Sequence, residues 1–119
     1  NVPEDGIYCL NKTLLARKDD LQKFVQASLK GWEYAREHKE ETLEVVMRIM
    51  KEEHVATNRA HQSWMLDRML ELIEPGAKKV KKGELAESDF HKAQSVLIDD
   101  QTLKTRIPFR EFYQPVLSE

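Results

Sequence analysis

The chain has 119 residues, a net charge of −2 at pH 7, 40% hydrophobic residues and 34% charged residues. This composition fits one globular domain with a well-solvated surface, and the near-neutral charge excludes a strong field for recruiting nucleic acid or an anionic membrane. The single cysteine, Cys9, excludes an internal disulfide, and no apolar run approaches the roughly 20 residues that a membrane-spanning helix needs.

The first residues combine a turn, a short β-prone run and a short helix. Pro3 to Gly6 is a turn signal, and "GIYCL" at 6–10 has the residue types of a strand. Asn11 suits the cap of a helix over 12–17. "NVPEDG" lacks an initiator methionine and a basic signal-peptide region, so we expect the chain to be a piece of a longer protein.

A long amphipathic helix is expected from Asp19 or Asp20 to about Glu37. Its apolar residues recur at steps of three and four and form one face: Leu21, Phe24, Val25, Leu29, Trp32 and Ala35. Gly31 lies on the flank of this face, in line with Ala27 and Ala35. Glycine lowers helix stability by roughly 1 kcal/mol relative to alanine. We therefore expect Ala27, Gly31 and Ala35 to form a groove for close helix packing with Trp32 in the core, a tolerated surface glycine being the alternative.

Two further helices follow in the middle of the chain. One begins near Lys39, and its apolar residues surround enough of the helix to predict burial on two sides: Leu43, Val45, Val46, Met47, Ile49 and Met50. The next is expected from a Thr57 cap to about Glu74. The residues expected to face inward there are Met65, Met69, Leu72 and Ile73, with Trp64 at the edge.

The last third predicts a basic loop, a fifth helix and an aromatic tail. "AKKVKKGE" at 77–84 follows the Pro75-Gly76 break, and we expect a solvated loop there rather than a phosphate or nucleic-acid site. Ser88 suits the cap of the fifth helix. The tail "RIPFREFYQP" is irregular and aromatic, which favours packing back on the body.

No pattern of catalytic or metal-binding residues is present. The four histidines lack the H-E-x-x-H spacing of a zinc site, and none follows a glutamate at the spacing of a di-iron bundle. Cys9 lies in an apolar run, where a small buried hydrophobe is expected rather than a nucleophile. The four glycines are too scattered to form a phosphate-binding loop. We therefore expect no enzymatic activity, no cofactor and no metal.

Several stretches together resemble one family. "VPEDGIYCLNKTL", "LQKFVQASLKGWEYAREHKEETLEVVM", "TNRAHQSWML" and "FREFY" are similar to the solute-binding proteins of bacterial ABC importers, in the branch that binds thiamine-pyrimidine precursors and alkylsulfonates. "ASLKGWEYA" is the most specific part of the resemblance. Lys39 departs from it, because relatives commonly have proline at that position.

The resemblance implies a fold and a location. It covers only the C-terminal portion of a two-lobed α/β protein, so residues 1–119 are expected to be one mainly helical domain of about five helices with one or two short strand segments. Such a piece would lack the N-terminal lobe and most of the cleft. Its exposed apolar surface then favours self-association. The family is periplasmic or extracytoplasmic and peripheral to the membrane.

The resemblance also implies a ligand and a partner. Glu4 or Asp5 would accept hydrogen bonds from an aminopyrimidine-like solute and Tyr8 would pack against it, an ordinary acidic turn being the alternative. The solute would be shared with the missing lobe and delivered to an ABC permease, without catalysis. Two other functions stay open: an extracytoplasmic sensor domain of a signalling receptor, and an autonomous helical protein-interaction domain.

Overall fold

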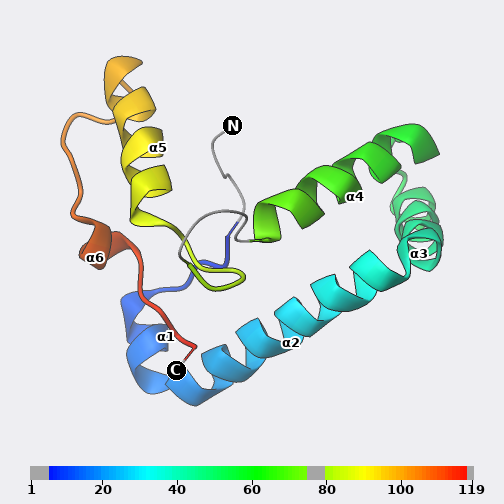
Figure 1. The fold of residues 1–119 in the computed structure, drawn as a ribbon, viewed down its shortest axis with the longest axis horizontal. Coiled ribbons are helices and arrows are strands. Elements are labelled where there is room, and N and C mark those ends of the chain that lie inside the picture. Colours follow the sequence, from blue (N-terminus) through cyan, green and yellow to red (C-terminus); the bar gives the residue numbers. More distant parts are fainter. Residues whose placement is uncertain (1–5, 75–79, 118–119) are drawn as a thin grey trace.

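The computed structural model describes residues 6–74 and 80–117, and within these ranges the chain is mainly helical, as predicted. Figure 1 shows the order and placement of the helices of the described ranges. They are α1 (Asn11–Ala16), α2 (Lys18–Glu37), α3 (Lys39–Glu52), α4 (Arg59–Ile73), α5 (Glu87–Asp99) and the short α6 (Phe109–Phe112). No helix in these ranges is long and apolar enough to cross a membrane.

The expected strand at 6–10 is wrong. Residues 6–10 are exposed and have no regular secondary structure, although their side chains are β-prone. A strand needs a neighbouring strand to pair its backbone N–H and C=O groups, and the described residues contain no strand that could pair with 6–10. Without that neighbour, propensity alone does not produce a strand.

Helices α2, α3 and α4 form one arm of the molecule. Only His38 separates α2 from α3, and the chain turns there so that α3 points into the plane of Figure 1. α4 then packs on α3. Arg59 donates from its two terminal nitrogens to Glu44 and Glu40, each at 2.5 Å, and Lys39 Nζ lies 2.6 Å from Asp67 Oδ1. These ion pairs join the first turns of α3 to the beginning and the middle of α4.

The covered side of α4 agrees only in part with the predicted one. Of the residues expected to face inward, Met69 and Ile73 are half-buried, whereas Met65 and Leu72 are exposed. The buried residue of this helix is Leu70, and Leu66 is half-buried. Two apolar stripes run along α4, one through Leu66 and Leu70 and one through Met65 and Leu72, and they lie on different sides of the helix. Sequence periodicity cannot tell which of two apolar stripes a neighbouring helix will cover.

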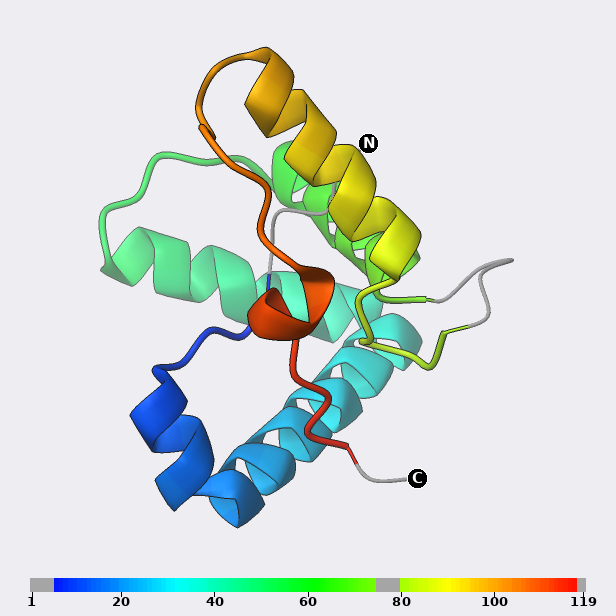
Figure 2. The same cartoon turned by 90° about the vertical axis from the view of Figure 1, so that its left-hand side faces the viewer.

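Helix α5 and the C-terminal tail form the second arm. Phe90 lies 5.4 Å from Phe109 and 5.1 Å from Phe112, measured between ring centroids. The buried Gln94 donates from Nε2 to the carbonyl of Ile107 at 2.8 Å. The aromatic tail therefore packs back on the body, as predicted. Figure 2 shows α6 and the tail lying across the side of the molecule that faces away from α4 in Figure 1.

The two arms leave the molecule open. Its radius of gyration is 16.6 Å, whereas a compact domain of this length has about 13.5 Å. The chain exposes 9587 Å², whereas a folded monomer of this mass exposes about 6,700 Å². Few apolar residues are buried within the described ranges, and they are Ala35, Leu43, Leu70, Ala86 and Phe90. Much apolar surface that a compact protein of this size would bury is therefore exposed.

Candidate functional site

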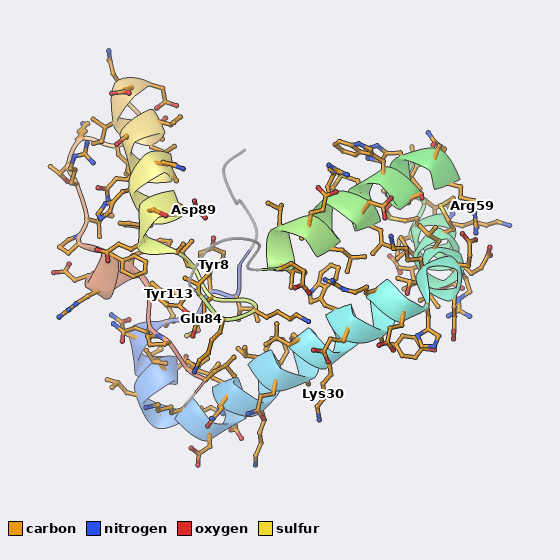
Figure 3. All side chains as sticks on the ribbon, viewed as in Figure 1. Tyr8, Lys30, Arg59, Glu84, Asp89 and Tyr113 are labelled. Atoms are coloured by element: carbon orange, nitrogen blue, oxygen red, sulfur yellow. The ribbon has the colours of Figure 1, made fainter. Side chains whose placement is uncertain are left out.

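The predicted ligand residues lie in the segment before α1. Tyr8 is 72% exposed, and in the view of Figure 3 it lies between the α5 arm and α4. Its ring folds back over Gly6, because a Cβ added at Gly6 would be 3.3 Å from the Tyr8 hydroxyl oxygen. Glu4 and Asp5 lie outside the described residues. Of the three predicted ligand residues, the described part of the chain therefore includes Tyr8, whose side chain is largely exposed.

The small residues of α2 do not form the expected close packing. Ala35 is buried and Trp32 is half-buried, but Ala27 and Gly31 are exposed. A Cβ added at Gly31 would meet no atom within 4 Å. The expected approach of another backbone to Gly31 is therefore not made by the described residues, because the helices that pack on α2 cover a different side of it.

The glycine that a neighbour does approach is Gly83, which sequence reasoning missed. Its φ of +77° lies in the left-handed region, and an added Cβ would be 2.8 Å from Leu29 Cδ2 of α2. Gly83 N–H also donates to the carbonyl of Ile73, at 3.4 Å. The only sequence signal was a glycine at the end of the basic loop, where a left-handed residue commonly completes a turn.

A chain of ion pairs holds this loop to α2 and α4. Arg36 lies 2.6 Å from Glu74, and Lys82 lies 3.1 Å from Glu74 and 3.2 Å from Glu33. The hydrogen bonds that Lys82 Nζ donates to the two carboxylates raise the pKa of Lys82, and Glu74 contributes most. Lys82 is therefore engaged in holding the loop to α2 and to the end of α4.

The best-formed grooves on the described part of the chain open widely to solvent. The first lies between the α2–α3 corner and α4, and it is lined by paired charges, among them Arg36, Lys39, Asp67 and Glu74. The second lies along α3, beside Met47, Lys51 and Val55. Small-molecule sites enclose most of the ligand surface, so neither groove by itself has the form of a solute-binding cleft.

A polar cluster lies at the corner between α2 and α3. The ring of Tyr34 stacks on His38 with centroids 4.0 Å apart, and its hydroxyl donates to Glu41 Oε2 at 2.8 Å. This hydrogen bond to a carboxylate raises the pKa of Tyr34. The cluster is exposed and fixes the corner. Sequence periodicity gave no signal for this cluster, because Tyr34 belongs to α2 and Glu41 belongs to α3.

No metal site is formed by the described residues: no group of three or more His, Cys, Asp or Glu side chains is placed to hold an ion.

A second tyrosine, Tyr113, has a raised pKa, chiefly because it is partly buried and also because Glu84 is close. Figure 3 shows Tyr113 and Glu84 near each other between α1 and α5. This contact ties the C-terminal tail to the 80–86 loop and is structural.

Comparison with known proteins identifies similarity in the N-terminal third. Residues 1–42 match the model of a family described as NMT1/THI5 like. No curated protein and no solved structure matches the chain. The matched stretch includes Tyr8 and the "ASLKGWEYA" segment of α2, so it is consistent with the solute-binding branch that these residues resemble.

Proposed function

We propose that this chain is a non-catalytic part of an extracytoplasmic solute-binding protein that delivers a small organic solute to an ABC importer. The observation that carries the proposal is the family match over residues 1–42. The solute is of the pyrimidine-precursor or sulfonate class, as the resembling proteins bind. An ABC permease is the protein partner, and the site of action is the periplasm or its equivalent outside the membrane.

The open surface supports the proposal that this chain supplies only one side of the binding cleft. Tyr8 presents an exposed ring, and the groove between the α2–α3 corner and α4 is open to solvent and lined largely by charged groups. A solute-binding cleft gains affinity from surfaces that close on both sides of the ligand. In this proposal Glu4, Asp5 and Tyr8 contribute one side, and a lobe outside residues 1–119 contributes the other.

Titration calorimetry with an aminopyrimidine and with an alkylsulfonate tests the function. The longer protein made from the native gene is expected to bind one of them, and residues 1–119 alone are expected to bind neither tightly. Tyr8→Ala in the longer protein is expected to weaken binding, whereas the matched change Tyr34→Ala is expected to leave it unchanged. Submicromolar binding by residues 1–119 alone would contradict the shared cleft. Absence of binding by the longer protein would contradict the function.

A further inference from the structure

The corner between α2 and α3 is made by a single residue. His38 has φ of −126° and ψ of 51°, whereas a residue inside an α-helix has about −63° and −42°. Helical hydrogen bonds continue on both sides of the corner. His38 N–H donates to the carbonyl of Tyr34, and Thr42 N–H donates to the carbonyl of His38, each at 2.9 Å. A rotation at His38 alone, mainly about ψ, would therefore join α2 and α3 into one helix.

The local sequence favours that continuous helix. Sharp bends in helices are commonly caused by proline or glycine, and neither occurs between Ala35 and Leu43. Most residues between these two are Arg, Glu or Lys, which have high helix propensity. The apolar steps of three and four also continue across the corner. In a continuous helix the apolar positions of α2 and α3 would lie on one stripe, interrupted by Lys39: Trp32, Ala35, Leu43, Val46 and Met50.

Tertiary contacts hold the bend instead. Arg36, at the end of α2, lies 2.6 Å from Glu74 and donates to the carbonyl of Leu70 at 3.4 Å, so it ties α2 to the last turn of α4. Across the corner, the Tyr34 hydroxyl donates to Glu41 at 2.8 Å. In a continuous helix these two residues would be about 10 Å apart along the axis, and the tyrosine side chain would point away from Glu41, toward the helix N-terminus. Both contacts therefore belong to the bent form alone.

We propose that His38 is a hinge with two states: the bent corner of this structure, and one continuous helix from α2 through α3. In the second state α3 and α4 swing away from α2 together, because the ion pairs of Arg59 with Glu40 and Glu44 lie between α3 and α4 and are retained. A partner that binds one state more tightly shifts the balance toward that state. The inference does not rest on the proposed function.

The two states differ enough in length to be distinguished. A continuous helix over residues 18–52 would be about 52 Å long, whereas the molecule extends 41 Å along its longest principal axis. Lys23 on α2 and Lys51 on α3 are exposed. In the continuous helix their Cα atoms would be about 42 Å apart. In the bent form they are closer, because the chain turns between them at His38 (Figure 1).

The test is double electron–electron resonance between spin labels attached at positions 23 and 51, with Lys23→Cys and Lys51→Cys in a Cys9→Ser background. The native corner is expected to give a major short distance and a minor population near 42 Å. Arg36→Gln is expected to raise the ratio of the long to the short population about 1.5- to 5-fold, the effect of losing a partly exposed ion pair. Lys30→Gln, at another exposed position of α2, is the matched control and is expected to leave the ratio unchanged.

Lys39→Pro tests the hinge from the opposite direction. Proline fits the first residue of α3 but cannot lie inside a continuous helix, because it lacks the N–H and its ring collides with the carbonyl four residues earlier. It is expected to remove the population near 42 Å. Lys39→Gln loses the same ion pair with Asp67 but keeps the backbone N–H, so it is expected to retain that population.

Three results would overturn the hinge. One is the absence of a population near 42 Å in both the native chain and Arg36→Gln. Another is its persistence in Lys39→Pro, and the third is an equal rise of the ratio in Lys30→Gln and Arg36→Gln. Far-ultraviolet circular dichroism checks that each variant keeps its helices.

Discussion

Gly83 lies directly over Leu29: a Cβ added to this glycine would be 2.8 Å from Leu29 Cδ2. The loop that follows α4 reaches α2 at this point, and the left-handed backbone of Gly83, with φ of +77°, allows the approach. This contact and the ion pairs of Lys82 and Glu74 are what connect the basic loop to the long helix.

Gly83→Ala is therefore expected to destabilise the protein by about 1–3 kcal/mol, because a non-glycine residue is strained at this backbone conformation. The added methyl group also displaces the tip of Leu29. Urea denaturation followed by circular dichroism measures the change in the free energy of unfolding. An unchanged midpoint would show that the loop does not approach α2 in this way.

Gly31→Ala is expected to have the opposite effect. The position lies inside α2 with nothing within 4 Å of an added Cβ, so alanine brings its higher helix propensity without a clash. The expected gain is about 0.5–1 kcal/mol in the free energy of unfolding, measured by the same urea titration. A loss of stability in residues 1–119 would instead reveal a close neighbour of Gly31. If only the longer protein is destabilised, the glycine serves packing against the rest of that protein.

Lys82→Gln is expected to lower the melting temperature more than Lys81→Gln does. Lys82 pairs with Glu33 and Glu74. The contact that Lys81 makes with Glu84 uses its backbone N–H, which the substitution retains. Because the Lys82 pairs are partly exposed, the difference between the two variants is expected to shrink in 1 M salt, where the screening length is about 3 Å. Thermal melts at low and high salt measure this difference in melting temperature. Equal effects of the two variants would contradict the ion pairs of Lys82 with Glu33 and Glu74.

Tyr34 is expected to titrate above its ordinary pKa of 10.0, because its hydroxyl donates to the carboxylate of Glu41. A raised pKa in the folded state means that the contribution of this contact to stability is complete below pH 10 and is lost as the pH rises through the folded pKa. Glu41→Gln is expected to lower the pKa of Tyr34 toward its ordinary value.

Carbon-13 NMR of the tyrosine Cζ atoms follows this titration residue by residue. Tyr113 is the control, since its pKa is raised chiefly by burial and by Glu84, and it is expected to be unaffected by Glu41→Gln. If Tyr34 titrated at the same pH in both proteins, the hydrogen bond at the α2–α3 corner would be absent.

The helices themselves could be predicted from local sequence. The spacing of apolar residues and the Pro75-Gly76 break placed the five main helices within a few residues of their observed bounds. Cap residues were less informative: Asn58, rather than the predicted Thr57, accepts the backbone N–H of His61 at the start of α4. Either residue type can cap a helix, and the local backbone decides which one does.

The candidate ligand residues could be proposed only from resemblance, and Tyr8 is the one that the described structure places. Its exposure could not be deduced from "GIYCL", because an apolar β-prone run predicts a paired strand. Whether a strand forms depends on a partner strand, which is a property of the whole assembly and not of these five residues.

The sequence by itself determined the extent of the helices to within a few residues, because breaking residues and apolar spacing act locally along the chain. Only the tertiary structure decided which faces of these helices are covered. On α4, Leu70 is buried while Trp64 stays exposed. On α2, Gly31 has open space beside it, and the glycine that lies close to a neighbour is Gly83, which approaches Leu29. Such choices depend on contacts between residues far apart in the chain, and local periodicity contains no information about them.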